Sequence, residues 1–300
     1  MSAASVPAPF GRVLTAMVTP FTAAGELDVD AAQRVASYLV DSGNDGLVLS
    51  GTTGESPTTS DEEKSRLAAA VLEAVGDRAH VLSGVGTADT AHSVHLAEQA
   101  AKAGVHGALL VTPYYSKPPQ AGIVEHVRTV AEAGGLPVML YDIPGRSAVG
   151  LAADTLVTLA QHELVVAVKD ATGDLNRGTD LMADTDLAFY SGDDALNLAW
   201  LTHGAVGIVS VVAHAAAATY AAMVRAVLES DLPGALRCHH EAAPAVRGLM
   251  SHTPGAIGAK VALRLLGVLD SARVRGPLPQ PDDELVARVR ADLVAAALLT

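Results

Sequence analysis

Leu164-Val165-Val166-Ala167-Val168, five apolar residues followed at once by Lys169, indicates what kind of strand this chain contains. The run does not alternate apolar with polar residues, which is typical of a parallel strand that helices cover on both sides. A lysine at the end of such a strand is unusual, because lysine is rarely buried without a partner. The run therefore predicts a buried parallel sheet and singles out Lys169.

Seven further apolar runs recur along the chain, about 20 to 35 residues apart, with helical patterns between them. One helical pattern opens with a capping box from Ser60 to Glu63, and Gly43, Gly104 and Gly204 stand where helix C-caps are common. The seven runs are Val13–Val18, Gly46–Leu49, His80–Ser83, Ala108–Val111, Pro137–Tyr141, Leu187–Tyr190 and Val206–Val212. Eight strands alternating with helices predict an α/β fold, a (β/α)8 TIM barrel with its active face at the strand C-termini. The alternative, an open doubly wound sheet, would want about six strands and a phosphate loop after the first, which is missing.

The pattern changes after residue 228. Residues 1–228 are expected to form the barrel with the active site, and residues 229–300 a C-terminal helical extension packed on it. Three helices are predicted for the extension: Leu232–His252, Gly255–Leu266 and Asp282–Leu299.

Composition narrows the class of protein. The chain has 300 residues, half of them hydrophobic, which is enough for a large globular core. A net charge of −13 gives nucleic acids and acidic membranes no electrostatic reason to bind. Cys238 is the one cysteine, Met1–Phe10 lacks the regions of a signal peptide, and no apolar stretch nears the roughly 20 residues of a membrane helix. A cytoplasmic protein is expected.

Lys169 is the first candidate for chemistry. Burial disfavours the ammonium and lowers the pKa of a lysine, which frees an amine to attack a carbonyl carbon. The alternative is a structural ion pair with Asp170 or another carboxylate.

Two other segments follow strands. Gly51-Thr52-Thr53-Gly54-Glu55-Ser56 could cradle a small carboxylate, because its glycines let backbone amides approach a ligand; it lacks the ending of a phosphate-binding P-loop. The alternative is an ordinary Ser/Thr-rich turn.

Tyr114-Tyr115 follows the fourth strand, and Tyr141 ends the fifth. A tyrosine hydroxyl beside a neutral amine can relay protons. The alternative is packing at the rim of the barrel.

Arg146 follows the fifth strand, where its guanidinium could hold a substrate carboxylate, with a surface salt bridge as the alternative. Gly192 and Val209, at the seventh and eighth strands, are expected to line the pocket floor. No metal site is predicted, because His239-His240-Glu241 lacks the i, i+4 spacing of a zinc helix. Gly84-Val85-Gly86 is a weak echo of a dinucleotide motif without its third glycine.

Taken in order, these motifs closely resemble those of the dihydrodipicolinate synthase family, which also holds N-acetylneuraminate lyase and related 2-keto-acid aldolases. The likeness runs from about Gly11 into the C-terminal helices. It is carried by Gly51-Thr52-Thr53-Gly54-Glu55, Thr112-Pro113-Tyr114-Tyr115, Tyr141-Asp142-Ile143-Pro144-Gly145-Arg146, Lys169-Asp170-Ala171 and Ser191-Gly192-Asp193-Asp194.

The resemblance implies a class I aldolase mechanism that needs no cofactor, with pyruvate as the first substrate. Lys169 would form the imine, and Thr52, Thr53 and nearby amides would hold the pyruvate carboxylate. Tyr141, Thr53 and Tyr115 would relay protons, with Tyr115 supplied by the neighbouring subunit of a tight dimer. Two such dimers would make a homotetramer.

Arg146 decides among members of the family. An arginine there implies L-aspartate 4-semialdehyde as the second substrate and 4-hydroxy-tetrahydrodipicolinate as the product, a step towards diaminopimelate and lysine. The alternatives are a 2-keto-3-deoxy sugar-acid or sialic acid lyase with the same imine, and a non-catalytic sensor of pyruvate-type ligands. Asp142, Asp170 and His214 stand where the family often has Asn, Glu and Asn, which we regard as mild departures.

The resemblance also bears on regulation. Lysine-inhibited relatives bind the effector at positions that match Asp61, Lys64, Ala88 and His92. Lys64 and His92 offer no negative charge to the effector's ammonium, and Ala88 offers no side-chain hydrogen bond. The sequence predicts weak or absent inhibition by lysine.

Overall fold

Eight parallel strands close into a barrel in sequence order, β1 to β8, as the prediction requires. The structure is a computed structural model and describes residues 7–300; residues 1–6, part of the segment expected not to be a signal peptide, lie outside the described residues. The strands are β1 (Val13–Ala16), β2 (Gly46–Leu49), β3 (His80–Gly84), β4 (Gly107–Val111), β5 (Val138–Asp142), β6 (Val165–Asp170), β7 (Ala188–Ser191) and β8 (Gly207–Ser210). The predicted (β/α)8 barrel is confirmed.

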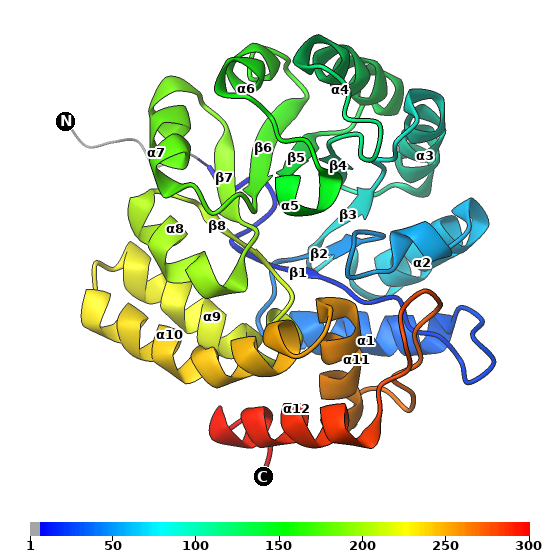
Figure 1. Cartoon of the computed structure of the whole chain (residues 1–300), viewed down its shortest axis with the longest axis vertical. Coiled ribbons are helices and arrows are strands. Elements are labelled where there is room, and N and C mark those ends of the chain that lie inside the picture. Colours follow the sequence, from blue (N-terminus) through cyan, green and yellow to red (C-terminus); the bar gives the residue numbers. More distant parts are fainter. Residues whose placement is uncertain (1–6) are drawn as a thin grey trace.

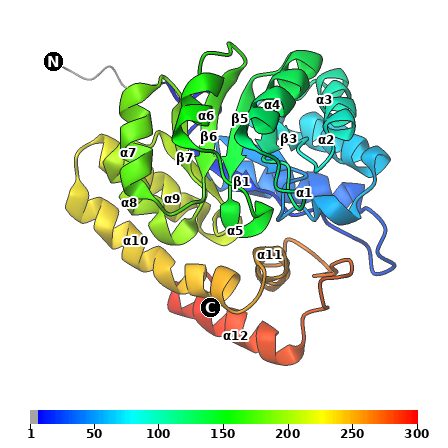
Figure 2. The same ribbon diagram turned by 45° about the horizontal axis from the view of Figure 1, so that its top comes forward.

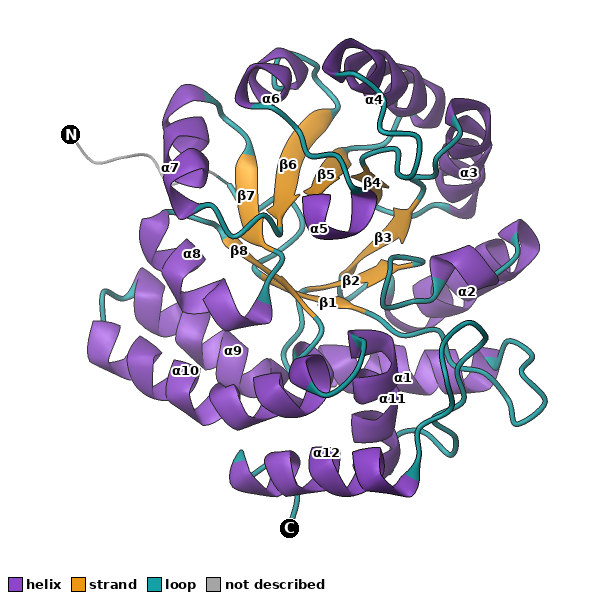
Figure 3. Cartoon of the chain, viewed as in Figure 1, coloured by secondary structure: helices purple, strands orange, loops and turns teal. Residues whose placement is uncertain are grey.

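Helices surround the strands in an outer ring (Figure 1; Figure 3). They are α1 (Val29–Asp41), α2 (Asp61–Val75), α3 (Thr90–Ala103), α4 (Gln120–Gly134), α6 (Ala153–Leu159), α7 (Leu175–Asp184), α8 (Asn197–His203) and α9 (Ala213–Leu228). A single turn, α5 (Pro144–Ser147), lies over the centre of the ring of strands, and the sequence pattern does not predict it.

The helix ends predicted from capping residues are correct at the start of α2 and at the ends of α3 and α8. The Ser60 hydroxyl accepts a hydrogen bond from the Glu63 amide (3.1 Å), and the Glu63 carboxylate accepts one from the Ser60 amide (2.9 Å). Gly104 and Gly204 end α3 and α8 in the left-handed conformation that glycine adopts without steric cost. These ends fix where each connecting loop leaves the barrel.

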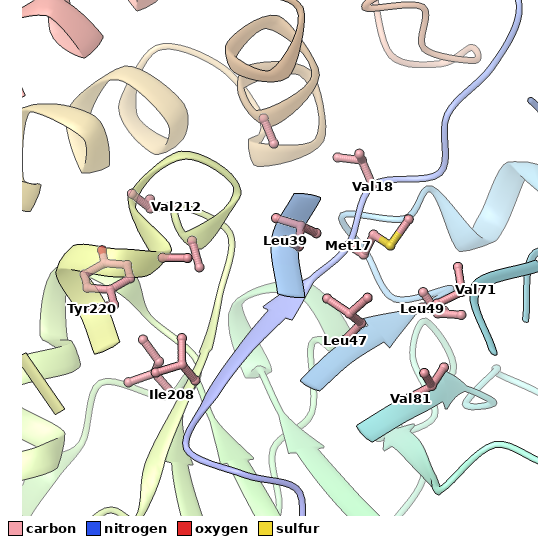
Figure 4. Packing of buried hydrophobic residues seen from close by; sticks show 14 of the residues in the cluster. Met17, Val18, Leu39, Leu47, Leu49, Val71, Val81, Ile208, Val212 and Tyr220 are labelled. Atoms are coloured by element: carbon pink, nitrogen blue, oxygen red, sulfur yellow. The ribbon is translucent and has the colours of Figure 1, made fainter. Parts of the chain in front are cut away.

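The core has two parts. Side chains from the outer faces of the strands pack in one apolar cluster with side chains of the helices, as Leu47 does near Leu39 of α1 (Figure 4). A smaller apolar cluster fills the barrel interior and includes Tyr141. The barrel is therefore packed through its centre, and the site can open only at one end.

Three helices follow α9 and pack below the barrel in the tilted view (Figure 2): α10 (Leu232–Val246), α11 (Gly255–Leu265) and α12 (Asp283–Ala295). The helix expected over Leu232–His252 is α10 followed by a π-helical turn, Arg247–Ser251. None of the helices in residues 7–300 has the length and apolar character that crossing a membrane requires.

Candidate active site

A cavity of about 410 Å³ lies at the C-terminal ends of the strands, on the face expected for catalysis in this fold. Loops after β2, β3 and β5 form much of its wall, and α5 contributes Arg146 and Ser147. The lining residues are Ser50, Gly51, Thr52, Ser56, Pro57, Gly84, Gly86, Leu109, Val111, Tyr114, Tyr141, Ile143, Arg146 and Ser147. Of the predicted site residues, Thr52, Tyr141 and Arg146 lie in this wall.

Lys169 lies in β6, one residue beyond the run expected to form the strand, and is only 5% exposed. It pairs in register with Tyr141 of β5, and its Nζ lies 4.1 Å from the centre of the Tyr141 ring. Burial lowers the pKa of Lys169 to about 8; the charge of Asp194 opposes this effect and that of Arg146 adds to it. The amine therefore lies behind the wall of the cavity, against Tyr141, and loses its proton far more readily than an ordinary lysine.

The alternative role for Lys169, a structural ion pair, is wrong for residues 7–300. Asp170 instead accepts hydrogen bonds from the Thr172 hydroxyl (2.7 Å) and amide (2.8 Å), and it pairs with Arg177 (3.2 Å). Asp194 accepts hydrogen bonds from the Ser210 hydroxyl and from the backbone amides of Val211 and Val212, just before α9. With these carboxylates bonded elsewhere, the Lys169 amine has no ion-pair partner in the described chain.

Tyr141 is buried, which raises the pKa of its hydroxyl to about 12, while a hydrogen bond with the Thr52 side chain acts in the opposite direction. Thr52 is exposed at the cavity, whereas Thr53 is buried and does not line it. The geometry thus brings Thr52 to Tyr141. The sequence analysis assigned Thr53 to the relay with Tyr141, whereas Thr52 is the threonine that lies with Tyr141 in the cavity wall.

The turn from Gly51 to Ser56 is held by its own backbone and by the segment that follows β1. The Thr19 hydroxyl donates to the Gly54 carbonyl (2.6 Å), and the Glu55 amide donates to the Thr52 carbonyl (3.1 Å). A Cβ at Gly54 would lie 3.1 Å from the Met17 carbonyl oxygen, so glycine allows the turn to pack closely against the segment after β1. The turn is therefore rigid.

Arg146 is exposed, and its guanidinium makes no hydrogen bond or ion pair with residues 7–300, so the surface salt bridge considered for it is not present there. Tyr114 lines the cavity. Tyr115 does not: it is 92% exposed, and its backbone is left-handed with φ 71°. The chain's own fold does not bring Tyr115 to Tyr141.

Gly192 and Val209 do not line the cavity. A Cβ at Gly192 would lie 3.0 Å from Lys169 Cγ, so the absence of a side chain leaves room for the lysine stem. Val209 is 2% exposed and belongs to the apolar cluster inside the barrel, together with Tyr141. Gly192 therefore shapes the surroundings of Lys169, and Val209 is part of the packed barrel interior.

Sequence reasoning missed Arg177 of α7. Its guanidinium bonds Asp142 (2.9 Å) and Asp170 (3.2 Å), the residues that directly follow Tyr141 and Lys169. Burial raises the pKa of Asp142 to about 6, and Arg177 acts against this rise. Asp142 and Asp170 could have pointed to such a residue, because two buried carboxylates at the ends of neighbouring strands need a cation nearby.

The two glycines of Gly84-Val85-Gly86 also have a role that the sequence did not reveal. Both line the cavity, and a Cβ on Gly86 would lie 2.6 Å from the Val111 amide nitrogen. Gly86 therefore allows a close approach to the end of β4, and Gly84 allows one to the loop after β2, where a Cβ would lie 2.3 Å from the Ser50 carbonyl oxygen. Within residues 7–300 no group of three or more His, Cys, Asp or Glu side chains is arranged to hold a metal ion.

Known proteins resemble this chain over nearly its whole length. The model of the Dihydrodipicolinate synthetase family matches residues 9–296. A 4-hydroxy-tetrahydrodipicolinate synthase of Kineococcus radiotolerans is 60% identical over 97% of this chain and 94% of its own. Two solved structures superpose closely: the synthase of Cyanidioschyzon merolae with lysine bound (38% identity, TM-score 0.93, 97% of this chain and 99% of the other), and the chloride-inhibited synthase of Acinetobacter baumannii complexed with pyruvate (32%, TM-score 0.92, 97% and 100%).

Proposed function

We propose that Lys169 forms an imine with pyruvate in the reaction of this chain, which belongs to the dihydrodipicolinate synthetase family. The chain condenses pyruvate with L-aspartate 4-semialdehyde to give 4-hydroxy-tetrahydrodipicolinate. The chain is a lyase of diaminopimelate and lysine biosynthesis. The single observation that carries the mechanism is a buried lysine without an ion-pair partner in residues 7–300, in contact with Tyr141 at the cavity.

The first half of the reaction needs a neutral amine and a proton relay. The Lys169 amine attacks the keto carbon of pyruvate, the carbonyl oxygen takes up a proton, and the resulting carbinolamine loses water to leave the imine. A methyl proton of pyruvate then leaves, and the enamine carbon attacks the aldehyde carbon of the second substrate. Each proton transfer needs a group within hydrogen-bond reach, and Tyr141 has the position for it.

Thr52 and Tyr141 form the part of the relay within one subunit, because both line the cavity and the Thr52 side chain acts to lower the pKa of the Tyr141 hydroxyl. This proposal revises the expectation that Thr53 is the relay threonine. Thr52 and the backbone amides of the turn hold the carboxylate of pyruvate, and the buried Thr53 side chain supports the turn beside them. A rigid turn rich in free amides and hydroxyls suits a small carboxylate.

Tyr115 completes the relay from a neighbouring subunit in this proposal. Two observations support this role: the Tyr115 side chain is exposed, and its backbone is left-handed. A left-handed backbone costs a non-glycine residue about 1–2 kcal/mol, and such strain persists where function requires it. A dimer that exchanges Tyr115 in both directions is symmetric, and two such dimers make the proposed homotetramer. Family membership also supports a cytoplasmic location and chemistry with no cofactor beyond the imine.

Arg146 holds the carboxylate of L-aspartate 4-semialdehyde. It lies at the cavity with its guanidinium unbonded in residues 7–300, and a planar guanidinium matches a carboxylate in two parallel hydrogen bonds. Sugar-acid cleavage through the same imine is not favoured.

Borohydride trapping tests the imine. Incubation with pyruvate and borohydride, followed by peptide mass analysis, should give a pyruvyl adduct on Lys169. Lys260 is an internal control, because burial lowers its pKa to about 8 too, yet it is paired with Glu55 away from the cavity. An adduct on Lys260 instead, or none, would refute the mechanism. Arg146→Met should trap pyruvate normally but lose turnover with L-aspartate 4-semialdehyde.

A further inference from the structure

A buried ion pair joins the C-terminal extension to the turn that lines the cavity. Lys260 of α11 places its Nζ 2.5 Å from Glu55 Oε1, and the two side chains are 0% and 2% exposed. Lys260 also donates to the Arg273 carbonyl (2.8 Å), and the Arg275 amide donates to Glu55 Oε2 (2.8 Å). Both carboxylate oxygens of Glu55 are therefore bonded to the extension, which lies on the β1 side of the barrel (Figure 1).

Glu55 needs this anchor because of its backbone. Its φ is 55° and its ψ 39°, a left-handed conformation that is unfavourable for a residue with a side chain. The Glu55 conformation sets the path of the turn, whose Thr52 carbonyl accepts the Glu55 amide. The carboxylate of Glu55 points away from the cavity, into the extension, so Glu55 acts on the turn and does not line the cavity wall.

The cations around Glu55 are held in their turn by an aromatic ring and a second carboxylate. Lys260 Nζ and Arg275 Cζ each lie 4.1 Å from the centre of the Phe21 ring. Arg275 pairs with Glu63 at the start of α2 (2.6 Å) and donates to the Gly25 and Thr58 carbonyls. The cluster thus links the loop after β1, the turn, α2 and the extension.

We infer that Lys260 is a positioning residue for the pyruvate carboxylate: through Glu55 it holds the turn that carries Thr52 and Thr53. This inference rests on the proposal that the turn binds that carboxylate. It gives the C-terminal extension a part in substrate binding although none of its residues lines the cavity. A displacement of the turn by about 1 Å would weaken binding on the order of tenfold to a hundredfold.

The test compares Lys260→Met, Glu55→Gln and the double variant, with KM for each substrate, kcat and the urea midpoint as readouts. Each single variant leaves one buried group unpaired and should lose stability, whereas the double variant should recover much of it. All three should raise KM for pyruvate at least about tenfold, with a smaller change in KM for L-aspartate 4-semialdehyde. A double variant with near wild-type stability and an unchanged KM for pyruvate would overturn the inference.

A matched control lies within the extension. Arg247 and Asp292 form an ion pair between the π-helical turn and α12, away from the cavity, so Arg247→Met combined with Asp292→Asn should lower stability and leave KM for pyruvate unchanged. An equal rise in KM there would refute a specific role for Lys260. Thr52→Val, at the threonine that lines the cavity, separates the two proposals. If it raises KM for pyruvate and the Lys260 variants do not, only the inference fails; if it has no effect on KM, the carboxylate assignment fails and the inference with it.

Discussion

Replacing Lys169 by methionine should abolish turnover and, at neutral pH, make the protein more stable. The lysine is 5% exposed, and burial lowers its pKa from 10.5 to about 8. Each unit of such a difference corresponds to about 1.4 kcal/mol, so the charged lysine costs the folded state about 3 kcal/mol at pH 7. Methionine has a similar length and no charge, so it removes this cost without opening a large cavity.

One favourable contact is lost in the exchange. The ammonium lies over the Tyr141 ring, and a desolvated contact of this kind contributes up to about 2 kcal/mol. The net gain in the free energy of unfolding of Lys169→Met should therefore be about 1 to 3 kcal/mol. The sign depends on pH: a group whose folded pKa is lowered destabilises the folded state most below about pH 8, and this cost disappears as pH rises towards 10.5.

Urea unfolding at pH 7 and at pH 10, at one protein concentration, measures both effects, because the midpoint reports stability when the slope is unchanged. The advantage of Lys169→Met should shrink between the two pH values. Lys102→Met, at an exposed lysine of α3, is the control and should stay within about 0.5 kcal/mol of the wild type. A destabilised Lys169→Met at pH 7, or an advantage that does not shrink at pH 10, would refute the reasoning.

Asp142 should also make stability depend on pH. Burial raises the pKa of this carboxyl to about 6, so the free energy of unfolding should rise as pH falls from about 6 to 4. The urea midpoint of Asp142→Asn should not show this dependence on pH. An Asp142→Asn midpoint that varies with pH as much as that of the wild type would contradict the prediction. Refolding an equal mixture of Tyr115→Phe and Lys169→Met chains should restore about a quarter of wild-type activity if the tyrosine acts across a dimer, and none if it acts within one chain. Lysine at millimolar concentration should leave turnover nearly unchanged, because the Asp61 carboxylate already bonds His92 (3.0 Å); strong suppression would defeat this prediction.

The strands could be predicted because their signal is local. A parallel strand covered by helices is apolar in nearly every position, so eight such runs gave the barrel, and the strand ends gave Tyr141, Arg146 and Lys169. The end of β6 was harder to predict from the sequence. The strand includes Lys169 and Asp170, because they pair with β5 and β7 despite their charges. Pairing with a neighbouring strand overrides the local composition there.

Other features depend on contacts that no local pattern encodes. The choice between Thr52 and Thr53 follows from a left-handed residue two or three positions later, and nothing in Glu55 as a residue type predicts that conformation. Lys260 lies 205 residues from the carboxylate that it pairs with. Sequence alone shows that a buried lysine needs a partner, but only the fold determines which carboxylate supplies it.

The reactivity proposed for Lys169 depends on where the nearby carboxylates find their partners. Asp142 and Asp170 share Arg177, and Asp194 is occupied by hydrogen bonds from β8 and the segment just before α9. If one of them were released from its partner and turned towards Lys169, an ion pair would favour the ammonium and raise the pKa of the lysine. The arrangement that keeps the amine reactive is thus a matter of hydrogen bonding around the site, and the same residues bonded differently would make Lys169 a structural cation.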